Sequence, residues 1–172
     1  MLDFTVIEKH ETSLDEWLWN NDFRDLSDKV STIEDHAWSE LEDTFEEAVG
    51  WMFGKDFGWD DIDTDDLYDF CSSDEFEELV NTTYEVAEKL YHMDDGDKYA
   101  ELIEFLAEYD PFDRPFDDDE GKIKFCADIV GMIENDKEEL ISQLKRIRED
   151  VGDDTEDAET IDDYIEILKG EE

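Results

Sequence analysis

Apolar residues recur at helical spacing over a long stretch of the N-terminal half, and this pattern constrains the fold more than any other feature of the chain. Within residues 22–53 the apolar positions are three or four residues apart: Leu26, Val30, Ile33, Ala37, Leu41, Phe45, Ala48 and Met52. This spacing places them on one face of an α-helix. We expect one long amphipathic helix, or two helices in line with a break near residues 31–32. Gly54 or Gly58 suits its C-terminal end.

Residues that favour helix N-termini precede the other apolar segments. Five of them are predicted N-caps: Ser13, Thr64, Ser73, Asp97 and Asn135. The helix after Ser73 is expected to bury a face that ends with Leu90 and Tyr91. The pattern predicts an all-α protein of about seven helices in one compact or elongated bundle. Alternation in residues 2–7 allows one short N-terminal strand.

The length of 172 residues fits a single domain. We divide it into residues 1–110, an acidic helical part with the long amphipathic helix, and residues 122–172, a C-terminal helical part of the same domain. Residues 111–121 hold both prolines of the chain and predict a hinge rich in Pro and Asp between these parts.

Charge defines the class of partner. The chain has 57 Asp and Glu against 14 Lys and Arg, a net charge of −43, yet it is 39% hydrophobic and 13% aromatic. Disordered polyanions lack such apolar content, so this composition predicts a folded polyanion that binds basic proteins and is repelled by DNA and anionic membranes. Two cysteines without paired spacing predict free thiols. With no apolar run of about 20 residues, we expect a cytoplasmic protein.

The acidic residues are unevenly distributed along the sequence. Between Trp38 and Glu88 eighteen acids accompany one base, Lys55, whereas seven of the fourteen bases lie from Arg114 to Arg148. Acids at helical spacing form rows of charge about 5–6 Å apart, similar to phosphates along nucleic acid. The predicted phosphate-mimicking residues are Glu40, Glu42, Asp43, Glu46, Glu47, Asp56, Asp60, Asp61, Asp63, Asp65, Asp66, Asp69, Asp74, Glu75, Glu77 and Glu78.

Aromatic residues concentrate after the long helical pattern. Trp51, Phe53, Phe57 and Trp59 lie within nine residues of sequence. Aromatic side chains are enriched both in protein cores and at subunit interfaces. This group predicts either closure of the core at the helix end or a homodimer contact.

Signals for catalysis and for metal binding are weak. The three histidines are scattered, and no nucleophile elbow, zinc, P-loop or dinucleotide motif is present. Asp61, Asp63, Asp65 and Asp69 match four positions of a calcium-binding EF-hand loop. The match fails where the loop needs a glycine and a bidentate glutamate, because Asp66 and Ser72 stand there. We expect neither an enzyme, nor a cofactor, nor a dedicated metal site.

Residues 59–69, Trp-Asp-Asp-Ile-Asp-Thr-Asp-Asp-Leu-Tyr-Asp, resemble a segment of the Ocr-type anti-restriction proteins of bacteriophages. The resemblance covers eleven of the 172 residues. It implies an acidic, mostly helical dimer that mimics bent B-form DNA and occupies the DNA groove of restriction enzymes. The positions it touches are Asp60, Asp61, Asp63, Asp65, Asp66 and Asp69.

Charge and resemblance together predict a phage-encoded DNA mimic that occupies the DNA-binding site of a host defence enzyme, such as a restriction or CRISPR-type nuclease. An immunity protein that neutralises one basic nuclease toxin would carry similar charge. A third alternative is a salt-adapted or histone-chaperone-like acidic protein, since surface acids also support solubility and folding in high salt.

Overall fold

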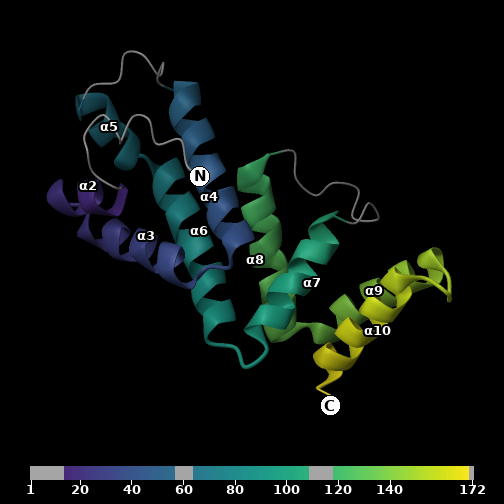
Figure 1. Ribbon diagram of the computed structural model, residues 1–172. Helices are drawn as coiled ribbons and strands as arrows, with labels where there is room; N and C mark the ends of the chain where they lie inside the picture. Colours follow the sequence, from purple (N-terminus) through teal and green to yellow (C-terminus); the bar gives the residue numbers. More distant parts are fainter. Residues whose placement is uncertain (1–13, 57–63, 109–117, 171–172) are drawn as a thin grey trace.

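The computed structural model describes residues 14–56, 64–108 and 118–170, without the side chains of residues 53–56, 64 and 66. These residues form nine helices and no strand, which confirms the all-α class (Figure 1). The helices are α2 (Leu14–Asn20), α3 (Arg24–His36), α4 (Ser39–Asp56), α5 (Thr64–Cys71), α6 (Asp74–Tyr91), α7 (Gly96–Glu108), α8 (Asp119–Asn135), α9 (Lys137–Val151) and α10 (Glu156–Lys169). The predicted strand at residues 2–7 lies outside the described residues.

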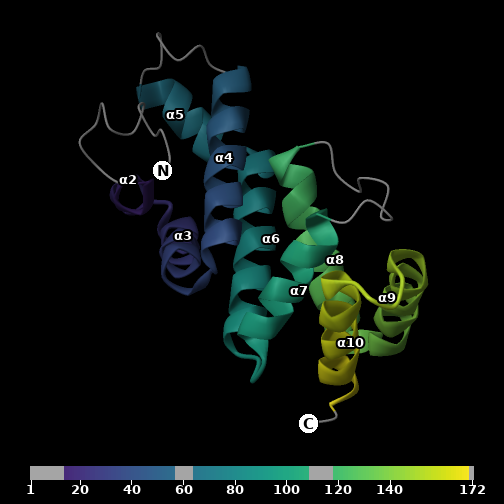
Figure 2. The ribbon, with the colours of Figure 1, turned by 45° about the vertical axis from the view of Figure 1, so that its right-hand side comes forward.

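The long helical pattern of residues 22–53 folds as two helices that lie at a steep angle to each other, so the prediction of one helix or two in line was wrong (Figures 1 and 2). The break lies at Ala37, which has an extended ψ of 145°, and not at residues 31–32. The Thr32 hydroxyl donates to the carbonyl of Asp28 at 2.9 Å inside α3, so it does not cap a new helix. The second helix, α4, continues past Gly54 to Asp56.

Helix ends follow the predicted caps only in part. Ser73 caps α6 as predicted, with its hydroxyl accepting from the backbone N–H of Phe76 at 3.3 Å. Asp136, and not Asn135, caps α9 through the N–H of Glu139. Asp97 lies in the first turn of α7, which begins one residue earlier. These displacements are small because Asp and Asn neighbours offer equivalent acceptors.

Two helices, α6 and α8, form the centre of the molecule. α6 contacts α3, α4, α7 and α8, whereas α8 also contacts α4, α7 and α9. One continuous core extends from Leu14 in α2 to Leu168 in α10, and residues such as Phe76, Leu106 and Ile161 are fully buried. Each apolar stripe is therefore buried by helices that are distant in sequence.

The C-terminal part is connected to the rest through α8. This helix begins at Asp119, so the last three residues of the predicted hinge 111–121 are helical, while residues 109–117 lie outside the description. α9 and α10 pack antiparallel as a hairpin against the end of α8 (Figure 2). None of the described helices combines the length and apolar character required to cross a membrane.

Candidate anionic binding surface

The surface of α4 carries acids on most of the arc that its buried residues leave free, with the exposed Trp51 beside them. The buried side chains lie on one side: Leu41, Thr44, Phe45, Ala48, Val49 and Met52. At 3.6 residues per turn, Glu40 and Glu47 flank this stripe on one edge, and Glu42 and Glu46 flank it on the other. Asp43 points outward between the two edges and is exposed. We call these five residues the α4 acidic face.

The first edge of the α4 acidic face meets a lysine and a third helix. The Nζ atom of Lys122 on α8 lies 2.6 Å from Oε1 of Glu40, and this hydrogen bond lowers the pKa of Glu40. Glu104 on α7 donates a second hydrogen bond to Glu40 when protonated. Burial, followed by the charge of Glu40, raises the pKa of Glu104. Two carboxyl groups therefore share one lysine at this edge.

A second carboxyl pair lies further along the same edge. Asp119, in the first turn of α8, shares a hydrogen bond with Glu47. Burial and the charge of Glu47 raise the pKa of Asp119, and Lys122 partly offsets them. The opening turn of α8 thus adds negative charge to the α4 acidic face.

The opposite edge of the face collects acids from three helices. Glu34 on α3 faces Asp15 of α2 together with Glu42 and Glu46 of α4. Desolvation, followed by the charges of these residues and of Asp35, raises the pKa of Glu34 to about 7. Desolvation is the larger cause, and the charges of the neighbouring acids act in the same direction, so the fold places Glu34 close to other carboxylates.

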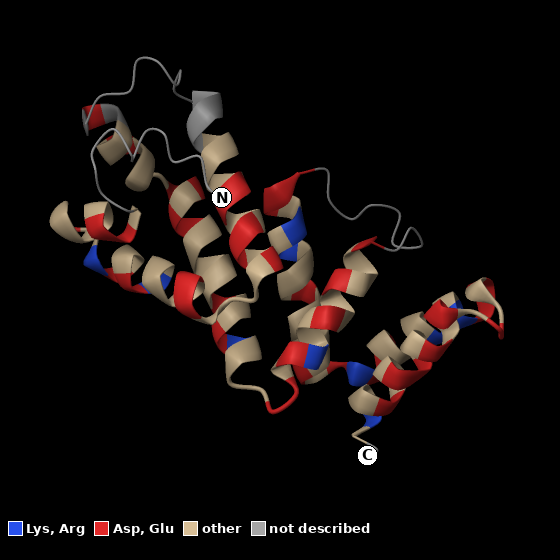
Figure 3. Cartoon of the chain, in the orientation of Figure 1, with Lys and Arg blue, Asp and Glu red and all other residues tan. Residues whose placement is uncertain are grey.

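The structure assembles only part of the predicted phosphate-mimicking set. All five residues of the α4 acidic face belong to it, and Figure 3 shows acids, in red, recurring along this helix. Asp65 and Asp69 are exposed on α5, and four more are exposed on the first turns of α6: Asp74, Glu75, Glu77 and Glu78. The predictions for Asp56, Asp60, Asp61, Asp63 and Asp66 concern residues or side chains outside the description.

The acids in the first turns of α6 have a local structural role. They follow the N-cap Ser73, where negative charge interacts favourably with the helix dipole. Glu78 acts on Lys124 of α8, which pairs with Glu120 at 2.8 Å. The candidate surface therefore centres on α4.

Folding changes the charge distribution that the sequence suggests. The acidic segment 40–88 contains a single lysine, yet α8 packs against α4 and supplies Lys122 to Glu40. Lys89 pairs with Glu134 of α8 at 3.0 Å. The uneven distribution of bases along the chain therefore does not carry over unchanged to the surface, because helix packing brings Lys122 of the later segment onto the acidic one.

Glu34, Glu104 and Asp119 join the surface although the sequence interpretation did not select them. Each lies on a helix other than α4, and each is recognisable only by its neighbours in space. Helical periodicity places them at the outer edges of their own helices, but it does not state which helix lies next to them.

The predicted interface aromatics are only partly described. Trp51 is 60% exposed on α4. The side chains of Phe53, Phe57 and Trp59 lie outside the description. The homodimer contact therefore stays a prediction.

Three bases cluster near the end of α9: Lys145, Arg146 and Arg148. One of them forms ion pairs with acids of the same hairpin. Arg148 lies 3.1 Å from Asp153 and 3.2 Å from Asp162. The side chains of Lys145 and Arg146 are exposed on α9. The hairpin therefore presents mixed charge, unlike the α4 acidic face.

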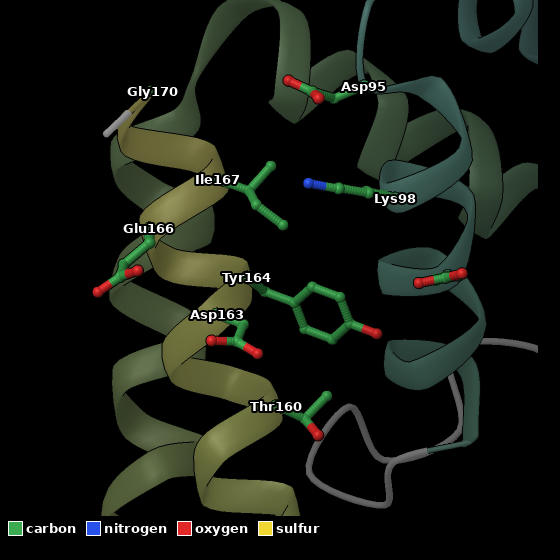
Figure 4. A pocket seen from close by; sticks show the side chains of 9 residues that line it. Asp95, Lys98, Thr160, Asp163, Tyr164, Glu166, Ile167 and Gly170 are labelled. Atoms are coloured by element: carbon green, nitrogen blue, oxygen red, sulfur yellow. The ribbon is translucent and has the colours of Figure 1, made fainter. Parts of the chain in front are cut away.

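A groove of about 690 Å³ separates α7 from α10 (Figure 4). Lys98 extends from α7 toward Ile167, and the ring of Tyr164 points across the groove from α10. Burial and the charges of Glu101, Glu104 and Asp163 raise the pKa of Tyr164. The lining mixes both signs of charge with apolar surface, so it is less selective for a cation than the α4 acidic face.

Groups typical of enzymes do not converge in the described part of the chain. There, no three His, Cys, Asp or Glu side chains are arranged to hold a metal ion. Both thiols are buried, and burial raises the pKa of Cys71 and of Cys126 to about 12. Such thiols are poor nucleophiles at neutral pH.

Comparisons with known proteins give no indication of function. No family model, curated protein or solved structure matches this chain.

Proposed function

We propose that the protein is a DNA mimic that occupies the DNA-binding site of a basic host-defence enzyme, with the α4 acidic face substituting for phosphates. The observation that carries the proposal is the crowding of carboxyl groups around α4. Neighbouring carboxylates contribute to the raised pKa of Glu34, Glu104 and Asp119. A fold that holds acids against mutual repulsion gains free energy when a basic surface neutralises them.

The spacing of the acids supports the same proposal. With a rise of 1.5 Å per residue, Glu40, Asp43 and Glu47 advance by about 4.5 and 6 Å along the helix axis. A DNA strand advances 3.4 Å per phosphate along its own axis. Acids from α3, α7 and α8 lie beside this row, although their raised pKa values and the charge of Lys122 reduce the negative charge that they add.

The test is competition with DNA for a basic enzyme. A labelled duplex is bound to a type I restriction enzyme and, separately, to a Cas9-type nuclease, and its displacement by the protein is followed by fluorescence anisotropy at 50 and 200 mM salt. We expect displacement of the duplex from at least one enzyme, with affinity falling steeply as salt increases. Simultaneous binding of duplex and protein to each enzyme would contradict occupation of the DNA site.

Two charge-matched variants separate a specific face from bulk charge. The face variant carries Glu42→Gln, Asp43→Asn and Glu47→Gln. The control carries Glu149→Gln, Asp150→Asn and Glu166→Gln, three exposed acids of α9 and α10. We expect the face variant to bind the displaced enzyme about tenfold more weakly and the control to retain affinity. Equal losses would show that net charge alone drives binding.

A further inference from the structure

A second hollow, of about 270 Å³, lies where the C-terminal ends of α3 and α6 meet the start of α7. Its walls include three aromatic rings, those of His36, Trp38 and Tyr91. Asp94 and Asp97 add two exposed acids, and the lining contains neither lysine nor arginine. The hollow is therefore aromatic and anionic, and about large enough for one side chain.

The turn between α6 and α7 gives the hollow its shape. Gly96 lies so close to Leu90 that a Cβ atom at this position would overlap with the Leu90 carbonyl oxygen. This close approach places the first turn of α7, with Asp97, beside the end of α6. Tyr91 was predicted to be buried, but it is 56% exposed because it lies on the final turn of α6. One face of its ring stacks on His36.

Two ring nitrogens in the lining are buried without a hydrogen-bond partner. One is Nε1 of Trp38, and the other is Nδ1 of His36, which lies 3.7 Å from Oε1 of Glu88. The ring of His36 stacks on Tyr91 with centroids 3.9 Å apart and planes 4° apart. Nδ1 of His36 already has Glu88 as an ion-pair partner when the ring is protonated. Buried polar atoms without partners are rare in folded proteins, so a hydrogen-bond acceptor that reaches Nε1 of Trp38 would complete the site.

We infer that this hollow binds the guanidinium group of an arginine side chain, supplied by the basic partner that the proposed function requires. A guanidinium is flat, stacks on aromatic rings such as Tyr91 and donates a fork of hydrogen bonds to carboxylates such as Asp94 and Asp97. The peptide carbonyl of the same arginine can accept from Nε1 of Trp38.

Other ligand classes fit the hollow less well. Anions are repelled by Asp94, Asp97 and the neighbouring Glu88. A neutral apolar group would leave Nε1 of Trp38 unpaired and would not neutralise Asp94 and Asp97. A lysine ammonium carries the right charge, but it is more strongly hydrated and lacks the flat face that stacks on Tyr91.

The first test compares octa-arginine with octa-lysine by isothermal titration calorimetry. Both peptides are attracted by the net charge, but only the arginine peptide gains from the hollow. We expect Tyr91→Ala to weaken octa-arginine about threefold to fivefold and octa-lysine less than twofold. Tyr68→Ala is the matched control, because Tyr68 is 49% exposed on α5 and lies outside the hollow. Equal weakening of both peptides by Tyr91→Ala would overturn the inference.

The second test uses a single arginine and does not depend on a DNA-binding enzyme. N-acetyl-arginine methylamide is titrated into the protein while the indole N–H signal of Trp38, assigned with Trp38→Phe, is followed by NMR. We expect a saturable shift, absent with the neutral citrulline analogue and reduced in Asp97→Asn. No shift with the arginine derivative would refute the hollow as an arginine site. Failure in the DNA competition alone would instead refute the proposed function, so the two failures are distinguishable.

Discussion

Replacing Glu34 by glutamine should stabilise the protein at high pH and leave its stability almost unchanged at low pH. The pKa of Glu34 is raised from 4.5 to about 7, so the folded state binds more protons than the unfolded state between these values. The stability of the native protein therefore falls as pH rises through this window. Above it, Glu34 is ionised where it is partly desolvated and where the acids of α2 and α4 repel it, and the glutamine variant avoids both costs.

The magnitude follows from the size of the window. At 1.36 kcal/mol per pH unit, an interval from 4.5 to about 7 corresponds to about 3 kcal/mol for a fully buried carboxyl. The Glu34 side chain is desolvated only in part and keeps contact with solvent, which screens its neighbours, so we expect about 1 kcal/mol.

The assay is urea denaturation of the native protein and of Glu34→Gln at pH 4.5 and pH 8, in low salt and in 0.5 M salt. The variant should be more stable at pH 8 in low salt, and the difference should shrink at pH 4.5 and in 0.5 M salt. Glu166→Gln on α10 is the control for loss of one exposed acid. The gain in unfolding free energy of Glu34→Gln over the native protein is the quantity compared. A gain at pH 8 that is no larger than the gain at pH 4.5 would refute the reasoning.

Three further predictions concern the core and its connections. Gly96→Ala should lower the free energy of unfolding by several kcal/mol, because the added Cβ atom meets the backbone of α6. Gly131→Ala should raise it by about 1 kcal/mol, because Gly131 lies inside α8 with open space around it. Urea titrations of both variants check this contrast. Leu106→Ala removes a side chain with 0% exposure and should cost about 2–5 kcal/mol, measured in the same way. Cys71 and Cys126 should resist a thiol reagent at pH 8 in the native protein and react fully in urea, because burial raises the pKa of both thiols to about 12; rapid labelling without urea would contradict their placement.

Local sequence patterns predicted the helices well, because helix formation depends on neighbours along the chain. The spacing of apolar residues predicted that the residues of α3 and α4 are helical, and Ser73 was predicted as the cap of α6. The break at Ala37 was missed, because the apolar spacing continues through it. The two helices pack against different partners, α3 against α6 and α4 against α8, and such tertiary contacts are not visible in the apolar spacing.

The sequence predicted the acids of α4 in the candidate surface but not the residues that other helices contribute to it. The five acids of the α4 acidic face follow from helical spacing within residues 40–47. Glu34, Glu104, Asp119 and Lys122 reach that face from three other helices. Charge interactions act through space, so their partners become known only when the helices are placed.

The sequence by itself determined that this protein is helical and strongly negative, since apolar periodicity and net charge are properties of the chain. The tertiary structure decided which acids lie together, how far Lys122 offsets them, and that Tyr91 and Trp38 meet in an acidic hollow. The physical reason is range: a helix forms from contacts between residues about four positions apart, whereas electrostatic crowding and binding hollows arise from helices that are distant in sequence.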